Sequence, residues 1–237
     1  PLVESGFASY DTAGLVYGGE IGWVMLKLKD EIELPGNDRV LKYLMALWSH
    51  NGATSFRIFP APMRAFCANV LNSLLASAKN GINIRHTASA DARIQEASRI
   101  VQASQGVYQD FAARAKKLAS TRMSDDTMTA LTEYLLPAKA NSNGDTEVST
   151  RSRHIRESIM HLFVHGAGHE AIRGTAWAGY NAVAEYADHH RSTRVGEDGD
   201  KDETRFAATM WGSGSQLKTK AINWIDSNVI EAEYRAV

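Results

Sequence analysis

The sequence has very little cysteine and no long apolar run. Its 237 residues include one cysteine, Cys67, which excludes a disulfide framework and, lying on an apolar stripe, indicates a buried structural thiol. No apolar run approaches the roughly 18 residues of a membrane span, and no charged-then-apolar leader opens the chain. We therefore expect a cytoplasmic protein without a membrane partner. Because the chain begins with Pro1 and not Met, we also expect an N-terminal portion to be missing.

Acidic residues are absent from one long stretch. Residues 39–90 contain six Lys or Arg residues and no Asp or Glu, although the whole chain has a formal net charge of only −1. Hydrophobic residues make up 44% of the chain and charged residues 22%, which is typical of a globular protein. A basic stretch within a folded region predicts a surface that binds an anionic partner.

Two hairpins are predicted in the first 60 residues. Gly18-Gly19 and Asn51-Gly52 each lie between two runs of strand-forming residues, and Asn-Gly favours the positive φ angles of a type I′ turn. The four predicted strands are Leu15–Tyr17, Ile21–Leu28, Leu41–His50 and Thr54–Phe59. Consecutive hairpins predict a small antiparallel β-meander.

A helix is predicted to cover this meander. Apolar residues recur between positions 63 and 78 at the spacing of one helix face. Arg64, Asn72 and Lys79 would then lie on the opposite side, which carries no acid. The predicted class is α+β, with a small antiparallel β-meander and its covering helix followed by a helical C-terminal half.

A long helix is predicted after residue 90. From Ile94 to Leu118, apolar or small residues recur in steps of three and four, a 3.5-residue repeat that could pack within the subunit or against a neighbour. Further helices are predicted at 124–136, at 150–165, at 175–191 and around an interruption at Gly212-Ser213-Gly214. We expect the helical region, 91–237, to pack on the basic region, 1–90, as one domain.

Three histidines are spaced like metal ligands. His161, His165 and His169, followed by Glu170, would align three imidazoles on a continuous helix. Two glycines after His165 are expected to end that helix and leave His169 in a loop, so we predict no metal site and no cofactor. The sequence also lacks a nucleophile elbow, a phosphate-binding glycine loop and paired carboxylates in an apolar setting, and we predict no catalytic residue.

A second polar pattern lies further along the chain. Trp177, Asn181, Glu185 and His189 step by four, and Asp188 lies beside the same helix face. Such a ridge is typical of a helix–helix contact that contains one polar network, and a ligand site is the alternative.

Four segments carry a resemblance to a known family. They are Ser49-His50-Asn51-Gly52 with Phe56-Arg57, Pro62–Asn72, Ile84-Arg85-His86-Thr87 and Gly174–His189. In this order they resemble the phage/plasmid-like family known as domain of unknown function 932, over most of the chain. The resemblance implies a phage or plasmid setting and no particular reaction, and the three histidines at 161, 165 and 169 are not part of it.

We predict a single-stranded DNA-binding protein of phage or plasmid recombination, similar in plan to annealing proteins of the RecT and Red-beta type. Annealing needs charge neutralisation and accessible bases, so a basic groove suffices without covalent chemistry. Subunits would form a homo-oligomeric ring or filament, and Trp48 or His86 could stack on bases. The residues predicted to bind nucleic acid are Arg57, Arg64, Asn69, Asn72, Lys79, Arg85 and His86.

Two other functions remain open. One is a self-assembling structural or regulatory protein of a mobile element, whose basic region meets an acidic patch such as residues 196–203 of a neighbouring subunit. The other is a metal-dependent hydrolase that uses His161, His165 and Glu170.

Overall fold

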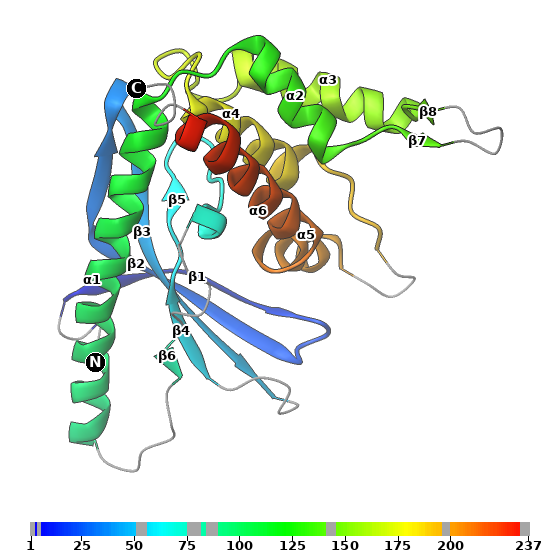
Figure 1. Cartoon of the computed structure of the whole chain (residues 1–237). Helices are drawn as coiled ribbons and strands as arrows, with labels where there is room; N and C mark the ends of the chain where they lie inside the picture. Colours follow the sequence, from blue (N-terminus) through cyan, green and yellow to red (C-terminus); the bar gives the residue numbers. More distant parts are fainter. Residues whose placement is uncertain are drawn as a thin grey trace.

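The first part of the chain forms an antiparallel sheet, and helices form most of the rest (Figure 1). The computed structural model describes residues 3, 6–50, 56–74, 82–83, 90–140, 146–195 and 200–232. The sheet has the order β1-β2-β3-β4-β6, and β5 also pairs with β3. Its strands are β1 (Ala8–Val16), β2 (Ile21–Leu34), β3 (Asp38–Ser49), β4 (Arg57–Pro60), β5 (Met63–Arg64) and β6 (Ile82–Asn83). This arrangement confirms the predicted α+β class.

Both predicted hairpins are present. In the first, β1 pairs with β2 up to Val16 and Ile21, and Gly18 and Gly19 have φ angles of 64° and 94° in the connecting turn. Glycine adopts these positive angles without steric cost. In the second, β3 pairs with β4, while the Asn51-Gly52 turn lies outside the described residues.

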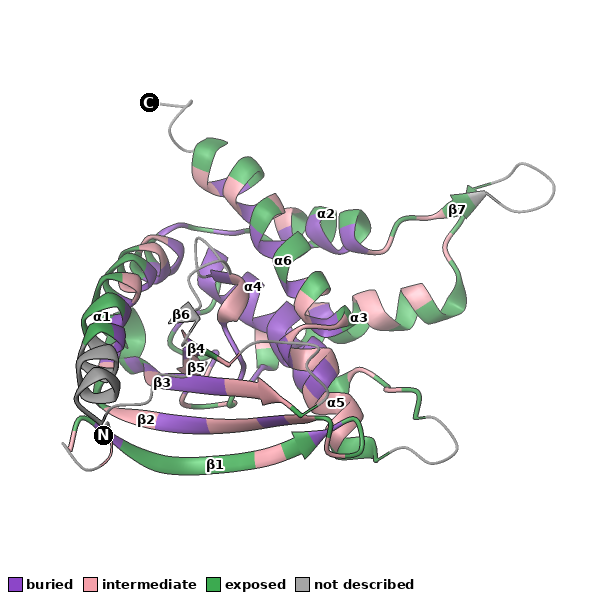
Figure 2. Ribbon diagram, turned by 90° about the horizontal axis from the view of Figure 1, so that it is seen from below, coloured by how far each residue is buried: buried purple, intermediate pink, exposed green. Residues whose placement is uncertain are grey.

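Different helices cover the two faces of the sheet. On one face, Leu44 and Ile58 pack with Ile100 of α1 (Ala90–Ser120). On the other face, Trp23 of β2 stacks on Phe206 of α5 (Lys201–Met210), with ring centroids 4.1 Å apart. The sheet is therefore a central layer, with β1 left at its outer edge, where Figure 2 shows the strand largely exposed.

The described part of the predicted helix, residues 63–74, is not helical over its length. Met63–Arg64 is strand β5, and a 3₁₀ turn follows at Asn72–Leu74. Phe66, a member of the predicted apolar stripe, is 54% exposed. Residues 75–80 lie outside the described residues. The prediction of a covering helix at this place is wrong, and α1 covers the sheet instead.

Contacts between distant parts of the chain explain the difference. Arg64 pairs with Val40 in the sheet, and its side chain forms an ion pair with buried Asp38. Leu71 and Leu74 are still buried, as their place on the apolar stripe requires, but they belong to an irregular segment packed into the main core. Tertiary contacts thus override the helical periodicity of this stretch.

The long helix predicted from Ile94 to Leu118 is confirmed as α1. Five positions of its 3.5-residue repeat, Ser104, Tyr108, Phe111, Ala115 and Leu118, are buried within the chain. The Tyr108 hydroxyl also donates a hydrogen bond to the Tyr43 carbonyl of β3. The C-terminal half of this repeat therefore packs within the subunit.

The remaining helices follow the predicted order. They are α2 (Asp125–Leu135), α3 (Thr150–His165), α4 (Ala176–Glu185) with a π-helical turn at Tyr186–His190, α5, and α6 (Ser213–Ile225) with a second π-helical turn at Asp226–Ile230. A short hairpin of β7 (Lys139–Ala140) and β8 (Thr146–Glu147) connects α2 to α3. Side chains of Ser124, Ser149, Thr175 and Asp200 cap the N-termini of α2, α3, α4 and α5.

Helix α4 forms the centre of the helical part. All ten of its residues are buried, and it contacts α1, α3 and α6. A single core cluster joins its residues to Ile32 and Val40 of the sheet, so both parts of the chain share one core. Among the described residues, no helix combines the length and apolarity needed to span a membrane.

Candidate functional site

The two arginines predicted to share a groove lie on opposite faces of the sheet. Arg57 pairs with Leu47 and Arg64 with Val40, and because these partners are seven residues apart on β3, their side chains point to opposite faces. Arg57 is exposed, whereas Arg64 has no exposed surface. The predicted role of Arg64 in phosphate binding is therefore wrong.

Of the other residues predicted to bind nucleic acid, the structure describes Asn69 and Asn72. Asn69 is wholly buried, so its predicted contact with sugar or phosphate is wrong as well. Asn72 is half-buried in the 3₁₀ turn. Lys79, Arg85 and His86 lie outside the described residues.

Arg64 instead belongs to a buried polar contact between the sheet and α4. Its Nε donates to Asp38 Oδ2 at 2.8 Å, and Trp177 Nε1 donates to the same oxygen at 2.6 Å. The two terminal nitrogens of Arg64 donate to the carbonyls of Ala167 and Gly168 at 2.8 and 3.1 Å. A fully buried guanidinium with these partners fixes the positions of β3, β5, α4 and the loop after α3.

A second buried ion pair lies further along the same helix. Lys218 Nζ of α6 donates to Asp188 Oδ1 at 2.7 Å and to the Val70 carbonyl at 2.9 Å, and the Val70 amide donates to Asp188 Oδ2 at 3.0 Å. Burial raises the pKa of Asp188 and lowers the pKa of Lys218, and the attraction between the two opposes both changes. The pair therefore connects three segments that are distant in sequence.

The ridge on α4 is confirmed as a helix contact with a polar network. Asn181 Nδ2 donates to the Trp177 carbonyl at 2.9 Å, and Glu185 accepts a hydrogen bond from the Ala167 amide at 3.2 Å. Asp188 is buried with them, while His189 is exposed. The network holds the fold together, because its charged groups are occupied by partners from the same chain.

The three spaced histidines do not meet at one point. The ring centroids of His161 and His165 are 4.8 Å apart on α3. His169 is buried in the loop beyond, with its Nδ1 3.3 Å from the Phe163 carbonyl oxygen. Burial, reinforced by the charge of Arg64, lowers the pKa of His169 to about 4. Within the described residues, no group of three His, Cys, Asp or Glu side chains is arranged to hold a metal ion.

An aromatic surface lies at the end of the sheet where strand β3 ends. We define the aromatic end as Trp48, His50, Phe56 and Arg57. The Trp48 and Phe56 rings stack with centroids 6.4 Å apart and planes inclined by 24°, and both are half-buried. His50 is exposed beside them, and Trp48 Nε1 donates to His50 Nε2 at 3.2 Å. Arg57 is exposed at the same end of the sheet but on its other face, because it pairs with Leu47, the neighbour of Trp48 on β3.

Glycine on the neighbouring strand makes room for the Trp48 ring. Gly22 of β2 pairs with Trp48, and a Cβ atom at this position would lie only 2.4 Å from the ring. The indole can therefore lie against the β2 backbone. The aromatic end therefore presents ring faces and a polar imidazole on one face of the sheet and the cation of Arg57 on the other.

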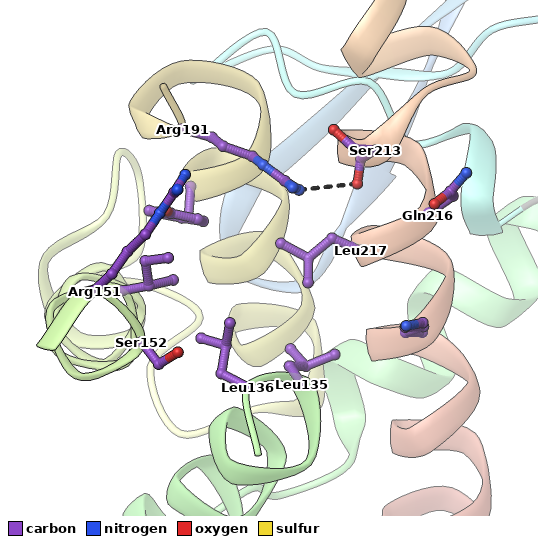
Figure 3. A pocket seen from close by; sticks show the side chains of 11 residues that line it. Leu135, Leu136, Arg151, Ser152, Arg191, Ser213, Gln216 and Leu217 are labelled. Carbon is purple, nitrogen blue, oxygen red and sulfur yellow. Dashed lines mark hydrogen bonds between the residues drawn. The ribbon is translucent and has the colours of Figure 1, made fainter. Parts of the chain in front are cut away.

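A pocket between the helices was not predicted from the sequence. It has a volume of about 430 Å³ and lies between the C-terminal end of α2, the start of α3, the π-helical turn after α4, and α6. Figure 3 shows Arg151 extending toward the turn that carries Arg191, and Arg191 extending across to Ser213, with Leu135 and Leu217 below. Lys220 also lines the pocket. These residues come from distant parts of the chain, so no local motif could have indicated the pocket.

The sequence matches a known protein family. The family described as "Domain of unknown function (DUF932)" matches residues 1–211, which is most of the chain. The chain belongs to this family. Neither the curated proteins nor the solved structures contain a match to this member of the DUF932 family. The matched residues include the sheet, the aromatic end and the ridge on α4, whereas α6 lies beyond them.

Proposed function

We propose that this protein is a cytoplasmic, non-enzymatic single-stranded DNA-binding and annealing protein of phage or plasmid recombination. The observation that carries this proposal is the stacked pair of Trp48 and Phe56 at the aromatic end, where Arg57 is exposed on the opposite face of the sheet. Aromatic side chains bind bases of any sequence through their faces, and cations bind the phosphate backbone. The aromatic end offers both kinds of group.

The charge of the surrounding sequence supports this proposal. Within the described residues, Arg57 forms no ion pair, so its charge is not neutralised by a carboxylate. Asn83 of β6 pairs with Arg57, and Arg85 and His86 follow Asn83 closely in the sequence. The acid-free stretch therefore contains further cationic groups close in sequence to this strand.

Self-assembly is supported by a different observation. Strand β1 is an edge strand that pairs only with β2 among the described strands, and it exposes Tyr10 and Leu15 by 72% and 52%. An exposed strand edge is a template for pairing with another chain. We therefore propose a homo-oligomer that assembles through β1, since the buried half of the α1 repeat already has its partners within the subunit.

The aromatic end is tested by a matched pair of double variants. We expect Trp48→Leu/Arg57→Gln to weaken binding of a labelled oligothymidylate by about 1–3 kcal/mol, because one base loses its stacking platform. The slope of log affinity against log salt should also fall by about 0.7, the value for one phosphate contact on a single strand. Fluorescence anisotropy over a salt series measures both quantities.

The control variant is Trp48→Phe/Arg39→Gln. It keeps an aromatic ring at position 48 and removes a cation from the opposite end of β3, where Arg39 forms an exposed ion pair with Glu31. We expect its affinity and salt slope to stay close to those of the parent protein. Equal losses in both double variants, at equal thermal stability, would contradict a binding site at the aromatic end.

A further inference from the structure

Three cations line the pocket between α2, α3 and α6. Arg151, Arg191 and Lys220 belong to its wall, and none of the described residues that line it is Asp or Glu. Its volume of about 430 Å³ lies within the range of roughly 300–1,000 Å³ that is usual for small-ligand pockets. The wall is therefore suited in size and charge to a small anion.

Contacts and charge connect two of these cations, Arg151 and Arg191, with the same part of the pocket. Arg191 Nη1 donates to the Ser213 carbonyl at 2.9 Å, which holds the side chain across the pocket (Figure 3). Both Arg151 and Arg191 lower the pKa of Tyr186, against the larger raising effect of burial, so their charges act on the same phenol. In the part of the chain that the structure describes, neither Arg151 nor Lys220 forms an ion pair.

One part of the pocket wall is apolar. Figure 3 shows Leu135, Leu136 and Leu217 below the arginines, and Ile155 and Tyr186 also line the pocket. An inorganic ion would use only the cationic wall. Guanidinium groups match the geometry of phosphate oxygens, and aliphatic and aromatic side chains pack against the face of a nucleobase. A molecule with a phosphate at one end and a base at the other would use both walls.

We propose that this pocket binds a phosphorylated nucleoside, with its phosphate on Arg151, Arg191 and Lys220 and its base against the apolar wall. The ligand can be a free mononucleotide or the phosphorylated 5′ end of a DNA strand, because both present the same chemistry. The site is separate from the aromatic end, since none of the residues that line it is Trp48, His50, Phe56 or Arg57.

Calorimetric titration of the full chain with dAMP, deoxyadenosine and inorganic phosphate tests this site. We expect dAMP to bind, deoxyadenosine to bind too weakly to detect, and inorganic phosphate to bind at least about tenfold more weakly than dAMP, because it lacks the apolar contact. Arg151→Gln and Lys220→Gln should each weaken dAMP binding by about tenfold or more, since each removes a charge-assisted contact.

The matched control is Arg153→Gln, which removes an exposed cation from the same turn of α3 but not from the pocket wall. It should leave dAMP affinity unchanged. The proposal is overturned if dAMP does not bind at millimolar concentration, if inorganic phosphate binds as tightly as dAMP, or if Arg153→Gln weakens binding as much as Arg151→Gln.

Oligonucleotides with and without a 5′ phosphate identify the source of the ligand. A preference for the phosphorylated strand that disappears in Lys220→Gln would assign the pocket to a strand end, and binding of dAMP without such a preference would assign it to a free nucleotide. Unphosphorylated DNA that binds through Trp48 and Arg57 while dAMP fails to bind would overturn the pocket proposal alone.

Discussion

The ion pair between Arg64 and Asp38, a residue distant in sequence, fixes the local structure around Arg64. Its guanidinium is wholly buried and is held by Asp38 and two backbone carbonyls. We expect Arg64→Met to lower the free energy of unfolding by about 3–5 kcal/mol, because Asp38 would remain as a buried charge without its cationic partner. Urea unfolding followed by circular dichroism measures the change.

The same substitution at Arg39 is the control for Arg64. Arg39 forms an exposed ion pair with Glu31 at 3.2 Å, and pairs of this kind contribute at most about 1 kcal/mol. Arg39→Met should therefore be nearly neutral. The Arg64 variant, at a temperature where it is folded, should keep the parental salt slope of DNA binding. A loss of slope without a loss of stability would return Arg64 to the list of phosphate contacts.

At the scale of elements, the loop between α3 and α4 makes stability depend on pH. His169 in this loop is buried, and its pKa falls from 6.5 to about 4 on folding. Between these values the unfolded chain binds more protons than the folded chain, so stability should decrease as the pH is lowered from about 6.5 to about 4. The loss attributable to His169 is about 3 kcal/mol at most.

A series of urea titrations between pH 4 and 7 tests the histidine. His169→Gln should show a shallower dependence of unfolding free energy on pH than the parent protein does. His161→Gln, which changes an exposed residue on α3, is the comparison and should keep the parental dependence. Parallel curves for the parent and His169→Gln would show that another group is responsible.

The sequence indicates elements well where their determinants are local. Gly18-Gly19 predicts the first hairpin, and the cap at Ser124 predicts the start of α2, because each signal acts within a few residues. The failure at residues 63–74 has the opposite cause. Asp38 lies outside this segment, and its ion pair with Arg64 cannot be recognised from the periodicity of the segment itself.

The candidate sites could likewise be predicted only where their residues are close in the sequence. Trp48, Phe56 and Arg57 are close in sequence, and the predicted hairpin brings them near one another, so part of the aromatic end could be anticipated. Arg151 and Lys220 belong to different helices, and only the packing of α3 against its neighbours places them around one pocket.

At the scale of the whole molecule, the free edge of β1 should control assembly. We expect the parent protein to form a homo-oligomer at micromolar concentration and Tyr10→Lys to shift it toward the 26.0 kDa monomer, because a charge on an edge strand opposes strand pairing. Light scattering coupled to size-exclusion chromatography measures the mass. Tyr134→Lys changes a tyrosine that is 53% exposed on α2 and should leave the mass unchanged.

A monodisperse monomer of the parent protein at micromolar concentration would contradict assembly through β1. It would also weaken the annealing proposal, which needs many subunits along one strand. An oligomer that persists equally in both tyrosine variants would place the contact on another surface.

The ion pair between Asp188 and Lys218 shows that the folded core extends beyond the residues that match the family. The match ends at residue 211, but Lys218 lies beyond it on α6 and supplies the cation for a carboxylate inside it. A gene fragment trimmed to the matched residues would encode a protein with Asp188 and the Val70 carbonyl facing an uncovered surface. The smallest portion that can be expressed and studied on its own should therefore extend through α6.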